Sequence, residues 1–379
     1  MSINIGTVIG VKIKLHYTWF IIFALVTWTL ASSYMPSQYP GLATHIYWVV
    51  GAISAISLFA SVLFHELAHS YVAKNQGLSV PSITLHLFGG VSQIAEEPKN
   101  PELEFSMAVV GPLSSFFLSV IFTGFLFLTN QFNLGALIAA PLSYISLINL
   151  FLGVFNLLPA FPLDGGRMLR AGIWKWKNNL IDATRKATKV SKGIAYVLLV
   201  MGVFGIILGL GIGSLWLVFI GWFIKDGAES SLKQTIVSEA LADVTVRQIM
   251  TRELVNVSPE QTVQDVIDNY FYRYKHGGFP VVRNGQLLGI ITTHDVREVE
   301  EHVMKRVEDV MTPKRDVITV KPDEPAMEAL VKLSKHDVGR LLVLDNEEFI
   351  GILTRSDLLR AVRTRIELGE KSSPPEIVT

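Results

Sequence analysis

The chain contains three long stretches without a charged residue, at positions 15–64, 105–163 and 193–224. A helix that crosses a membrane needs about 20 mostly apolar residues, so each stretch can hold a pair of helices, the third pair being short. The pattern predicts membrane helices near Tyr17–Ser33, Ile46–Lys74, Glu104–Thr129, Ala136–Leu157, Gly193–Leu208 and Ser214–Asp226. Buried helices of a soluble protein are the alternative, but uncharged runs of this length favour the membrane.

The charges that flank these helices are distributed unevenly. Lys12, Lys14, Lys74 and the basic segment 167–192 fall on one side of the predicted membrane domain. The loops on the other side, near residues 36–44, 130–135 and 210–213, carry no charge. Because cytoplasmic loops are enriched in Lys and Arg, the sequence predicts a multi-pass protein of the cell membrane, embedded in the lipid bilayer, with both termini in the cytoplasm.

The amino-acid composition excludes several classes of binding partner and catalytic site. Half of the 379 residues are hydrophobic and 17% are charged, against about 25% in soluble domains, and the mean hydropathy is +0.41. The 33 basic and 33 acidic residues balance, which argues against a nucleic-acid partner because no basic excess serves phosphate contacts. The chain has no cysteine, which excludes disulfides, thiol catalysis and thiolate metal sites. Any metal must be held by His, Asp or Glu.

The region after Asp226 has a different composition and repeats itself. From about residue 244, short Val/Ile/Leu runs alternate with charged helical stretches, as in a soluble α/β region. Three motifs recur in order: Arg247–Thr251 as Glu308–Thr312, Phe279–Val282 as Leu341–Leu344, and Gly289–Asp295 as Gly351–Asp357. The repeat resembles a tandem pair of CBS domains. This resemblance implies a cytoplasmic module that forms a homodimer and often binds an adenine nucleotide such as ATP.

Candidate catalytic chemistry lies in the second predicted helix, where residues 65–69 read H-E-x-x-H. Positions i and i+4 of a helix share a face, so His65 and His69 can bind one Zn²⁺. Glu66 is then placed to take a proton from the attacking water. Two packed histidines and a glutamate near a helix end are the alternative. Ionisable groups after a long apolar run are costly unless they serve a function, which favours the zinc interpretation.

A third metal ligand is expected because catalytic zinc sites usually have three protein ligands and an open position. Asp164 is the best candidate, since it is the first acidic residue after a long apolar block. Prolines and glycines flank it and interrupt the helix, so its carboxylate can project from irregular backbone that lines a cavity. An ordinary Asp-Gly turn explains the same residues, and the pattern alone does not decide between the two.

The two motifs together resemble the site-2 protease family of intramembrane zinc metalloproteases. The resemblance rests on H-E-x-x-H in an early helix and on N-x-x-P-x-x-P-L-D-G-G, residues 156–166, in a later one. It implies that His65, His69 and Asp164 are zinc ligands and that Glu66 is the general base. It further implies that Asn156 positions the substrate or stabilises the oxyanion. The CBS pair marks a known subgroup of this family.

Residues 83–94, between the second and third helices, are expected to form short strands around Gly89 and Gly90. By the same resemblance, this small sheet lies beside the active site, and its edge can hold an extended substrate by strand addition. A plain amphipathic hairpin is the alternative. His86 in this segment is expected to be a polar residue of the hairpin and not a ligand.

Each Gly-φ-φ-Thr-x-x-Asp motif of the CBS pair closes a strand and opens a helix. The threonine can cap the helix and the aspartate can complete a capping box. The same geometry suits a nucleotide, since helix N-termini favour phosphate and a carboxylate suits ribose hydroxyls. The resemblance assigns nucleotide binding to Thr292, Asp295, Thr354 and Asp357.

The predicted architecture is a polytopic α-helical membrane domain of about six transmembrane helices with a small β-hairpin, followed by a soluble α/β tandem CBS pair. The expected boundaries are a protease domain at 1–230, a linker at 231–243, CBS domains at 244–300 and 301–366, and a flexible tail at 367–379. The expected activity is cleavage of a transmembrane protein substrate near the cytoplasmic side, modulated by the CBS pair. A CBS-regulated transporter or channel and an inactive pseudoprotease scaffold are the alternatives.

Overall fold

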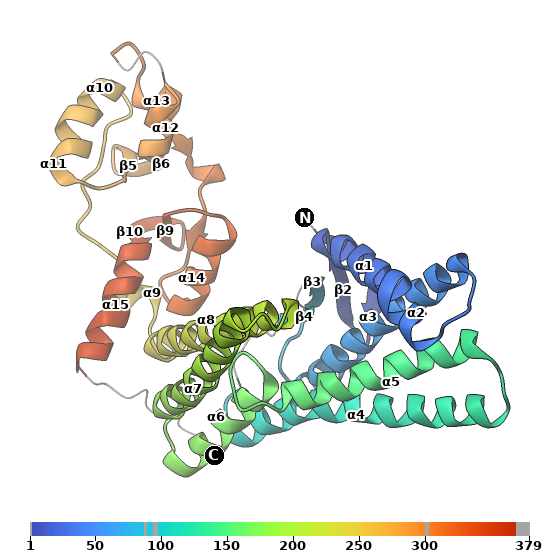
Figure 1. The fold of residues 1–379 in the computed structure, drawn as a ribbon. Helices are drawn as coiled ribbons and strands as arrows, with labels where there is room; N and C mark the ends of the chain where they lie inside the picture. Colours follow the sequence, from blue (N-terminus) through green and yellow to red (C-terminus); the bar gives the residue numbers. More distant parts are fainter. Residues whose placement is uncertain (1, 87–88, 94–97, 300–302, 369–379) are drawn as a thin grey trace. The chain divides into compact units, whose positions relative to one another are not determined.

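The computed structural model describes residues 2–86, 89–93, 98–299 and 303–368. The chain divides into two compact units, Met1–Lys233 and Gln234–Thr379, and each is described by itself (Figure 1). The predicted C-terminal tail lies outside the described residues from position 369 onward.

Long apolar helices make up most of the first unit (Figure 1). The first helical segment runs from α1 (Thr18–Thr29) through a π-helical turn (Leu30–Tyr34) into α2 (Met35–Gln38). The remaining helices are α3 (Thr44–Asn75), α4 (Pro101–Gln131), α5 (Ala136–Asn156), α6 (Asp164–Lys177), α7 (Leu180–Ile207) and α8 (Ile212–Leu241). Asn100 and Asn179 cap α4 and α7, each accepting a backbone N–H at 2.8 Å.

Among the described residues, five helical segments are long and apolar enough to cross a membrane. They are Thr18–Gln38, Thr44–Asn75, Pro101–Gln131, Ala136–Asn156 and Leu180–Ile207. Each overlaps one of the helices predicted from the sequence. The sixth predicted span, Ser214–Asp226, lies inside α8 and is not among the five, because the apolar start of α8 continues into Lys225, Asp226 and Glu229.

A four-stranded sheet accompanies these helices, in the order β1–β2–β3–β4. Its strands are β1 (Ser2–Val8), β2 (Val11–His16), β3 (Ser82–His86) and β4 (Gly89–Gln93). β2 and β3 are parallel and the other two pairs are antiparallel. The predicted strands at 83–94 are therefore present, although Gly89 and Gly90 lie in β4 and not in the turn. Positions 87–88 and 94 lie outside the described residues.

The sheet packs against the helices that carry the candidate site. Val11 and Ile13 of β2 and Ile83 of β3 are buried in one apolar cluster with Ala73 of α3 and Met107 of α4. β4 is at the edge of the sheet next to α3, and it has no further strand beyond it among the described residues. The buried face of β2 and β3 therefore fixes the place of the edge strand relative to the H-E-x-x-H helix.

The second unit contains two similar halves (Figure 1). In the first half, β5 (Gly278–Arg283) and β6 (Gln286–Thr292) lead into α12 (Thr293–Arg297). In the second half, β9 (Arg340–Asp345) and β10 (Glu348–Thr354) lead into α15 (Arg355–Leu368). The shorter elements are α9 (Val246–Ile249), α10 (Val263–Val266), a π-turn (Ile267–Phe271), α11 (Tyr272–Tyr274), α13 (Val307–Val310), β7 (Thr312–Pro313), a 3₁₀ turn (Lys314–Asp316), β8 (Thr319–Val320) and α14 (Ala326–Lys335).

The two halves exchange their leading segments. β7 precedes the second half in sequence but pairs with β6 of the first half. Thr251, which precedes the first half, pairs with Ile352 in β10 of the second half. The sheets are therefore β5–β6–β7 and β10–β9–β8, and each half depends on the other for its completion.

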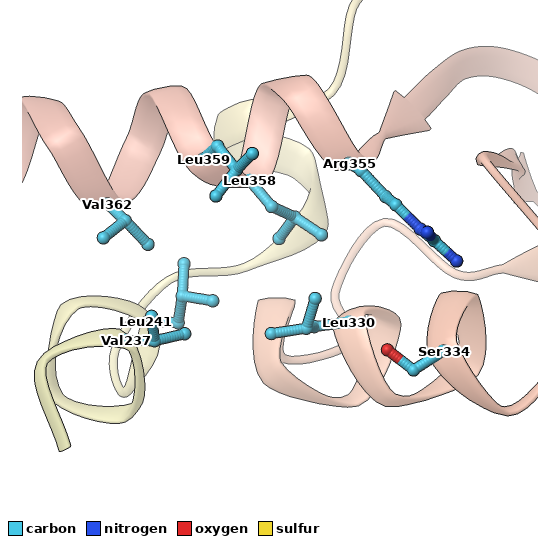
Figure 2. Close-up of a pocket in the computed structure, with 8 residues that line it drawn as sticks. All are labelled: Val237, Leu241, Leu330, Ser334, Arg355, Leu358, Leu359 and Val362. Carbon is cyan, nitrogen blue, oxygen red and sulfur yellow. The ribbon is translucent and has the colours of Figure 1, made fainter. Parts of the chain in front are cut away.

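An apolar pocket of about 320 Å³ lies between the end of α8, α14 and α15. Figure 2 shows Leu358, Leu359 and Val362 of α15 above it, with Val237 and Leu241 of α8 below. Leu359 is 67% exposed, so this part of the second unit presents apolar surface to its surroundings.

Candidate metal centre

Helix α3 places His65 and His69 on the same face, one turn apart, because residues i and i+4 of a helix share a face. Both are buried, with exposed fractions of 5% and 7%. Their Nε2 atoms lie 3.1 Å apart. The two imidazole rings therefore converge on one point at the side of α3.

Two residues of helix α4 contact the Nδ1 atoms of the two rings. His69 Nδ1 donates to the Met107 carbonyl oxygen at 2.6 Å, and His65 Nδ1 lies 3.0 Å from Ser115 Oγ. A carbonyl oxygen can only accept a hydrogen bond, so His69 carries its proton on Nδ1 and its Nε2 presents a lone pair. Partners of this kind fix the orientation of metal-ligating histidines and raise their basicity.

Asp164 joins the two histidines from a distant part of the sequence. It is the first residue of α6 and is buried. Its Oδ2 lies 3.2 Å from His65 Nε2 and 3.3 Å from His69 Nε2. The segment before it is anchored where the Phe161 N–H donates to Ser191 Oγ at 2.9 Å. The Asp164 carboxylate therefore points toward the two histidines.

These three side chains form a group able to hold a metal ion, with one potential ligand atom from each lying within 4.8 Å of the others. Two imidazole nitrogens and one carboxylate oxygen are a donor set that suits Zn²⁺, and three protein ligands leave a fourth position open. In the neutral His69 ring the Nδ1 contact leaves the Nε2 lone pair available, and Ser115 Oγ can accept from His65 Nδ1 in the same way, so the donor chemistry fits the metal.

Helix α4 approaches the histidines at Gly111. A Cβ atom at this position would lie 2.2 Å from His69 Nε2 and 2.7 Å from His65 Nε2. One face of α4 makes all three contacts, because Met107, Gly111 and Ser115 are spaced by four residues. It provides the carbonyl for His69, the space for both rings at Gly111, and the hydroxyl for His65. The sequence interpretation did not include these residues; a glycine and a serine on one face of an apolar helix were the available signal.

A buried ion pair joins α4 to α6. Arg170 donates to Glu104 Oε1 through Nε at 2.6 Å and also through Nη2. Glu104 has no exposed surface and Arg170 is 5% exposed, while Arg167 Nε lies 3.9 Å from the same oxygen. Sequence reasoning treated these two arginines as loop charges at the membrane edge. The structure adds that both contact Glu104 from the helix that begins at Asp164.

Glu66 is half-buried between α3 and the edge strand. A Cβ atom at Gly90 of β4 would lie 2.4 Å from Glu66 Cγ and 3.2 Å from its Oε1. The backbone of the edge strand therefore runs directly past this carboxylate. A peptide that paired with β4 would be brought next to Glu66.

The structure does not bring every predicted residue to the three-residue cluster. Asn156, the last residue of α5, donates from Nδ2 to the Leu152 carbonyl at 2.9 Å and contacts none of the three among the described residues. His86 ends β3, with its ring 4.9 Å from that of His16, and it lies outside the cluster.

The four predicted nucleotide residues form two equivalent caps. Thr292 N–H and Oγ1 both donate to Asp295 Oδ2 at 2.7 Å. Thr354 N–H and Oγ1 donate to Asp357 Oδ2 at 2.9 and 2.6 Å. The helix-capping role is thus present in both halves. Each aspartate keeps its Oδ1 for other groups, and a threonine from the exchanged segments reaches it: Thr312 Oγ1 at 3.1 Å and Thr251 Oγ1 at 3.5 Å.

Comparison with known proteins agrees with both units. The model of peptidase family M50 matches residues 53–139 and 129–202, and the CBS domain model matches residues 246–302 and 307–364. Zinc metalloprotease MJ0392 of Methanocaldococcus jannaschii is 33% identical over 98% of this chain and 98% of its own. Rip3 of Mycobacterium tuberculosis is 33% identical over 95% of this chain and 93% of its own. The solved site-2 protease of M. jannaschii is 33% identical over 61% of this chain and 95% of its own, with a TM-score of 0.41.

Proposed function

The chain belongs to peptidase family M50, the zinc metalloproteases, in the form that carries a C-terminal CBS pair, and on this premise we propose that it cleaves a transmembrane segment of a membrane-anchored protein. The observation that carries the proposal is the convergence of His65, His69 and Asp164 inside the membrane unit. Ionisable groups at such a place are costly unless they serve a function.

His65, His69 and Asp164 hold the zinc ion in this proposal, with Met107 and Ser115 fixing the two rings. Bound zinc supplies a Lewis acid that polarises the scissile carbonyl and lowers the pKa of water. Glu66 takes the proton of the attacking water and passes it to the leaving amine. Glu66 lies one residue from His65 and beside the edge strand, so it adjoins both the metal ligands and the path proposed for the substrate.

Asn156 is proposed to position the substrate or to stabilise the oxyanion. Its Nδ2 donates to Leu152, and among the described residues no donor reaches its Oδ1, which leaves that oxygen able to accept an N–H from a substrate backbone. The substrate itself must be extended, because the peptide bonds of a helix are hydrogen-bonded internally. Pairing with the free edge of β4 provides an extended form by strand addition.

We further propose that both termini and the CBS pair are cytoplasmic, so that cleavage releases a fragment into the cytoplasm. The apolar first half of α8 supplies the sixth crossing, and the basic side chains of α6 and α7 lie on the same side as the termini. The CBS pair binds an adenine nucleotide at its Asp295 and Asp357 caps and thereby modulates cleavage. The apolar surface around Leu359 supports the further proposal that the pair forms a homodimer.

The test uses purified protein in detergent with a single-span membrane protein as substrate. Glu66→Gln is expected to keep its zinc and to lose cleavage by about 10²–10⁴-fold, the usual contribution of a general base. Glu102→Gln, which changes an exposed carboxylate of the same unit, is the control and should behave like the wild type. Full activity in Glu66→Gln, or ion flux in proteoliposomes without any cleavage, would refute the protease mechanism.

A further inference from the structure

The two halves of the CBS pair differ at one position that faces the candidate nucleotide sites. In the aligned repeats, Gly289–Asp295 corresponds to Gly351–Asp357, and by the same alignment Gly277 and Gly278 correspond to Gly339 and Arg340. The first half therefore begins its first strand with glycine where the second half has arginine.

The Arg340 side chain crosses to the first half. A Cβ atom at Gly278 would lie 1.9 Å from Arg340 Nη1, and one at Gly277 would lie 2.6 Å from Arg340 Nη2. At the corresponding Gly339, a Cβ would meet nothing within 4 Å. The guanidinium thus lies over the start of β5, next to the end of β6 where the Thr292–Asp295 cap begins. The second half has no equivalent guanidinium, because the residue that corresponds to Arg340 is Gly278.

Arg340 is half-buried. Among the described residues, its guanidinium forms no hydrogen bond and no ion pair, although other arginines of the same unit, such as Arg247 and Arg283, each contact two carboxylates. Burial lowers the pKa of Arg340, and the charge of Asp295 offsets part of this effect. A half-buried cation is stabilised when an anion binds next to it, so the arrangement suits a site that is completed by an anion.

The groups around Arg340 complement a nucleoside phosphate. Asp295 Oδ2 is occupied by the Thr292 cap. Of the side chains that the structure describes, only Thr312 donates to its Oδ1, which can also accept from ribose hydroxyls. The guanidinium offers the planar pair of donors that binds phosphate in a bidentate manner. At the Asp357 end, Arg360 Nη1 lies 4.0 Å from Asp357 Oδ1, and the Arg360 side chain is 76% exposed.

We propose that Arg340 is the phosphate-binding residue of the Asp295 site, so that the CBS pair has two unequal sites and binds its phosphate-bearing adenine nucleotide at the Asp295 end. This inference rests on the proposed nucleotide binding. It adds which of the two sites binds the nucleotide, that the nucleotide carries a phosphate, and that Arg340 binds this phosphate. A nucleoside without phosphate gains nothing from Arg340, so the site discriminates between AMP and adenosine.

The test is calorimetry on the full-length protein in detergent, titrated with AMP and with adenosine. A charge-assisted contact of this type corresponds to about 10- to 100-fold in affinity. Arg340→Met is expected to weaken AMP by that factor and to leave adenosine unchanged. Arg360→Met removes the same charge next to Asp357 and should leave AMP unchanged. Asp295→Asn should weaken both ligands at the Asp295 site, whereas Asp357→Asn should leave the preference of that site for AMP over adenosine unchanged.

The outcomes separate this inference from the proposed function. Wild-type protein that binds neither AMP nor adenosine at millimolar concentration would refute nucleotide binding, and the inference with it. Binding with an unchanged AMP-to-adenosine ratio in Arg340→Met, or a loss of AMP confined to Arg360→Met, would refute only the role of Arg340. If Arg340→Met loses adenosine as well, Arg340→Lys decides: a preference for AMP supports the proposal, and equal affinities overturn it.

Discussion

Gly111 is a residue without a side chain on which the geometry of the candidate metal centre depends. The position lies in the interior of α4, where glycine is destabilising by about 0.5–1 kcal/mol relative to alanine. Its presence is explained by the two histidines, whose Nε2 atoms lie within 2.7 Å of any Cβ placed there. A methyl group would occupy the space in which the lone pairs of His65 and His69 converge.

Gly111→Ala is therefore expected to abolish zinc binding and cleavage, although alanine is the better helix former. Gly124→Ala in the same helix is the matched control, because a Cβ there meets nothing within 4 Å, and it should retain both properties. Zinc content by elemental analysis and cleavage of the single-span substrate are the measurements. Normal zinc content in Gly111→Ala would show that the rings can move aside.

The sequence could predict the residues of the site whose relation is local. His65, Glu66 and His69 follow from helical spacing, and Asp164 was identified by its position after an apolar block. Ser115 and the Met107 carbonyl could not be found in this way. Their distances of 50 and 38 positions from the histidines they contact are set by the packing of α4 on α3.

Between elements, the Glu104–Arg170 pair connects the helix that orients the histidines to the helix that begins at Asp164. Breaking a buried pair by removing one partner costs about 3–5 kcal/mol, because the other charge is left uncompensated. Replacing both partners by apolar side chains is often neutral. The pair is thus expected to position α6, and with it the Asp164 carboxylate.

Arg170→Met should lower both the thermal unfolding midpoint and the zinc content in detergent. The double variant Glu104→Met/Arg170→Met should recover most of the loss. Lys175→Met is the control, since it removes the exposed Lys175–Glu102 pair, and exposed pairs contribute about 0–1 kcal/mol. If Arg170→Met and Lys175→Met behave alike, the buried pair does not position α6.

Elements with a strong apolar signal were predictable, and those with mixed composition were not. The long membrane helices follow from uncharged runs. The β1–β2 hairpin was missed, although Val11, Ile13 and Leu15 alternate with Lys12 and Lys14 in the period-2 pattern of a strand. Helix α6 was read as a loop, because its arginines and lysines resemble a membrane flank and its pairing with Glu104 depends on tertiary packing.

At the scale of the whole molecule, the number of membrane crossings decides where the CBS pair lies. The chain has no cysteine, so single cysteines can report topology in intact cells. A cysteine at the exposed Ser37 should react with an impermeant maleimide from outside. A cysteine at the exposed Ser230 should react only after the membrane is permeabilised. Labelling of both positions from the same side would contradict the six-crossing arrangement and leave five crossings.

The residues that join the two units belong to a helix, along which the proposed effect of nucleotide binding on cleavage can pass. α8 continues to Leu241, so most of the predicted linker at 231–243 is helical. Any nucleotide effect on cleavage must come from different affinities for two states, and a coupling of about 1–3 kcal/mol, or 5–150-fold, is usual.

Gln234→Pro should interrupt this route, because proline inside a helix costs about 3 kcal/mol and removes a backbone hydrogen bond. The variant is expected to bind AMP and to cleave at the basal rate, but to lose the effect of AMP on cleavage. Gln234→Ala keeps the helix at the same exposed position and should keep the response. A full AMP response in Gln234→Pro would show that the signal passes between the units by contacts outside α8.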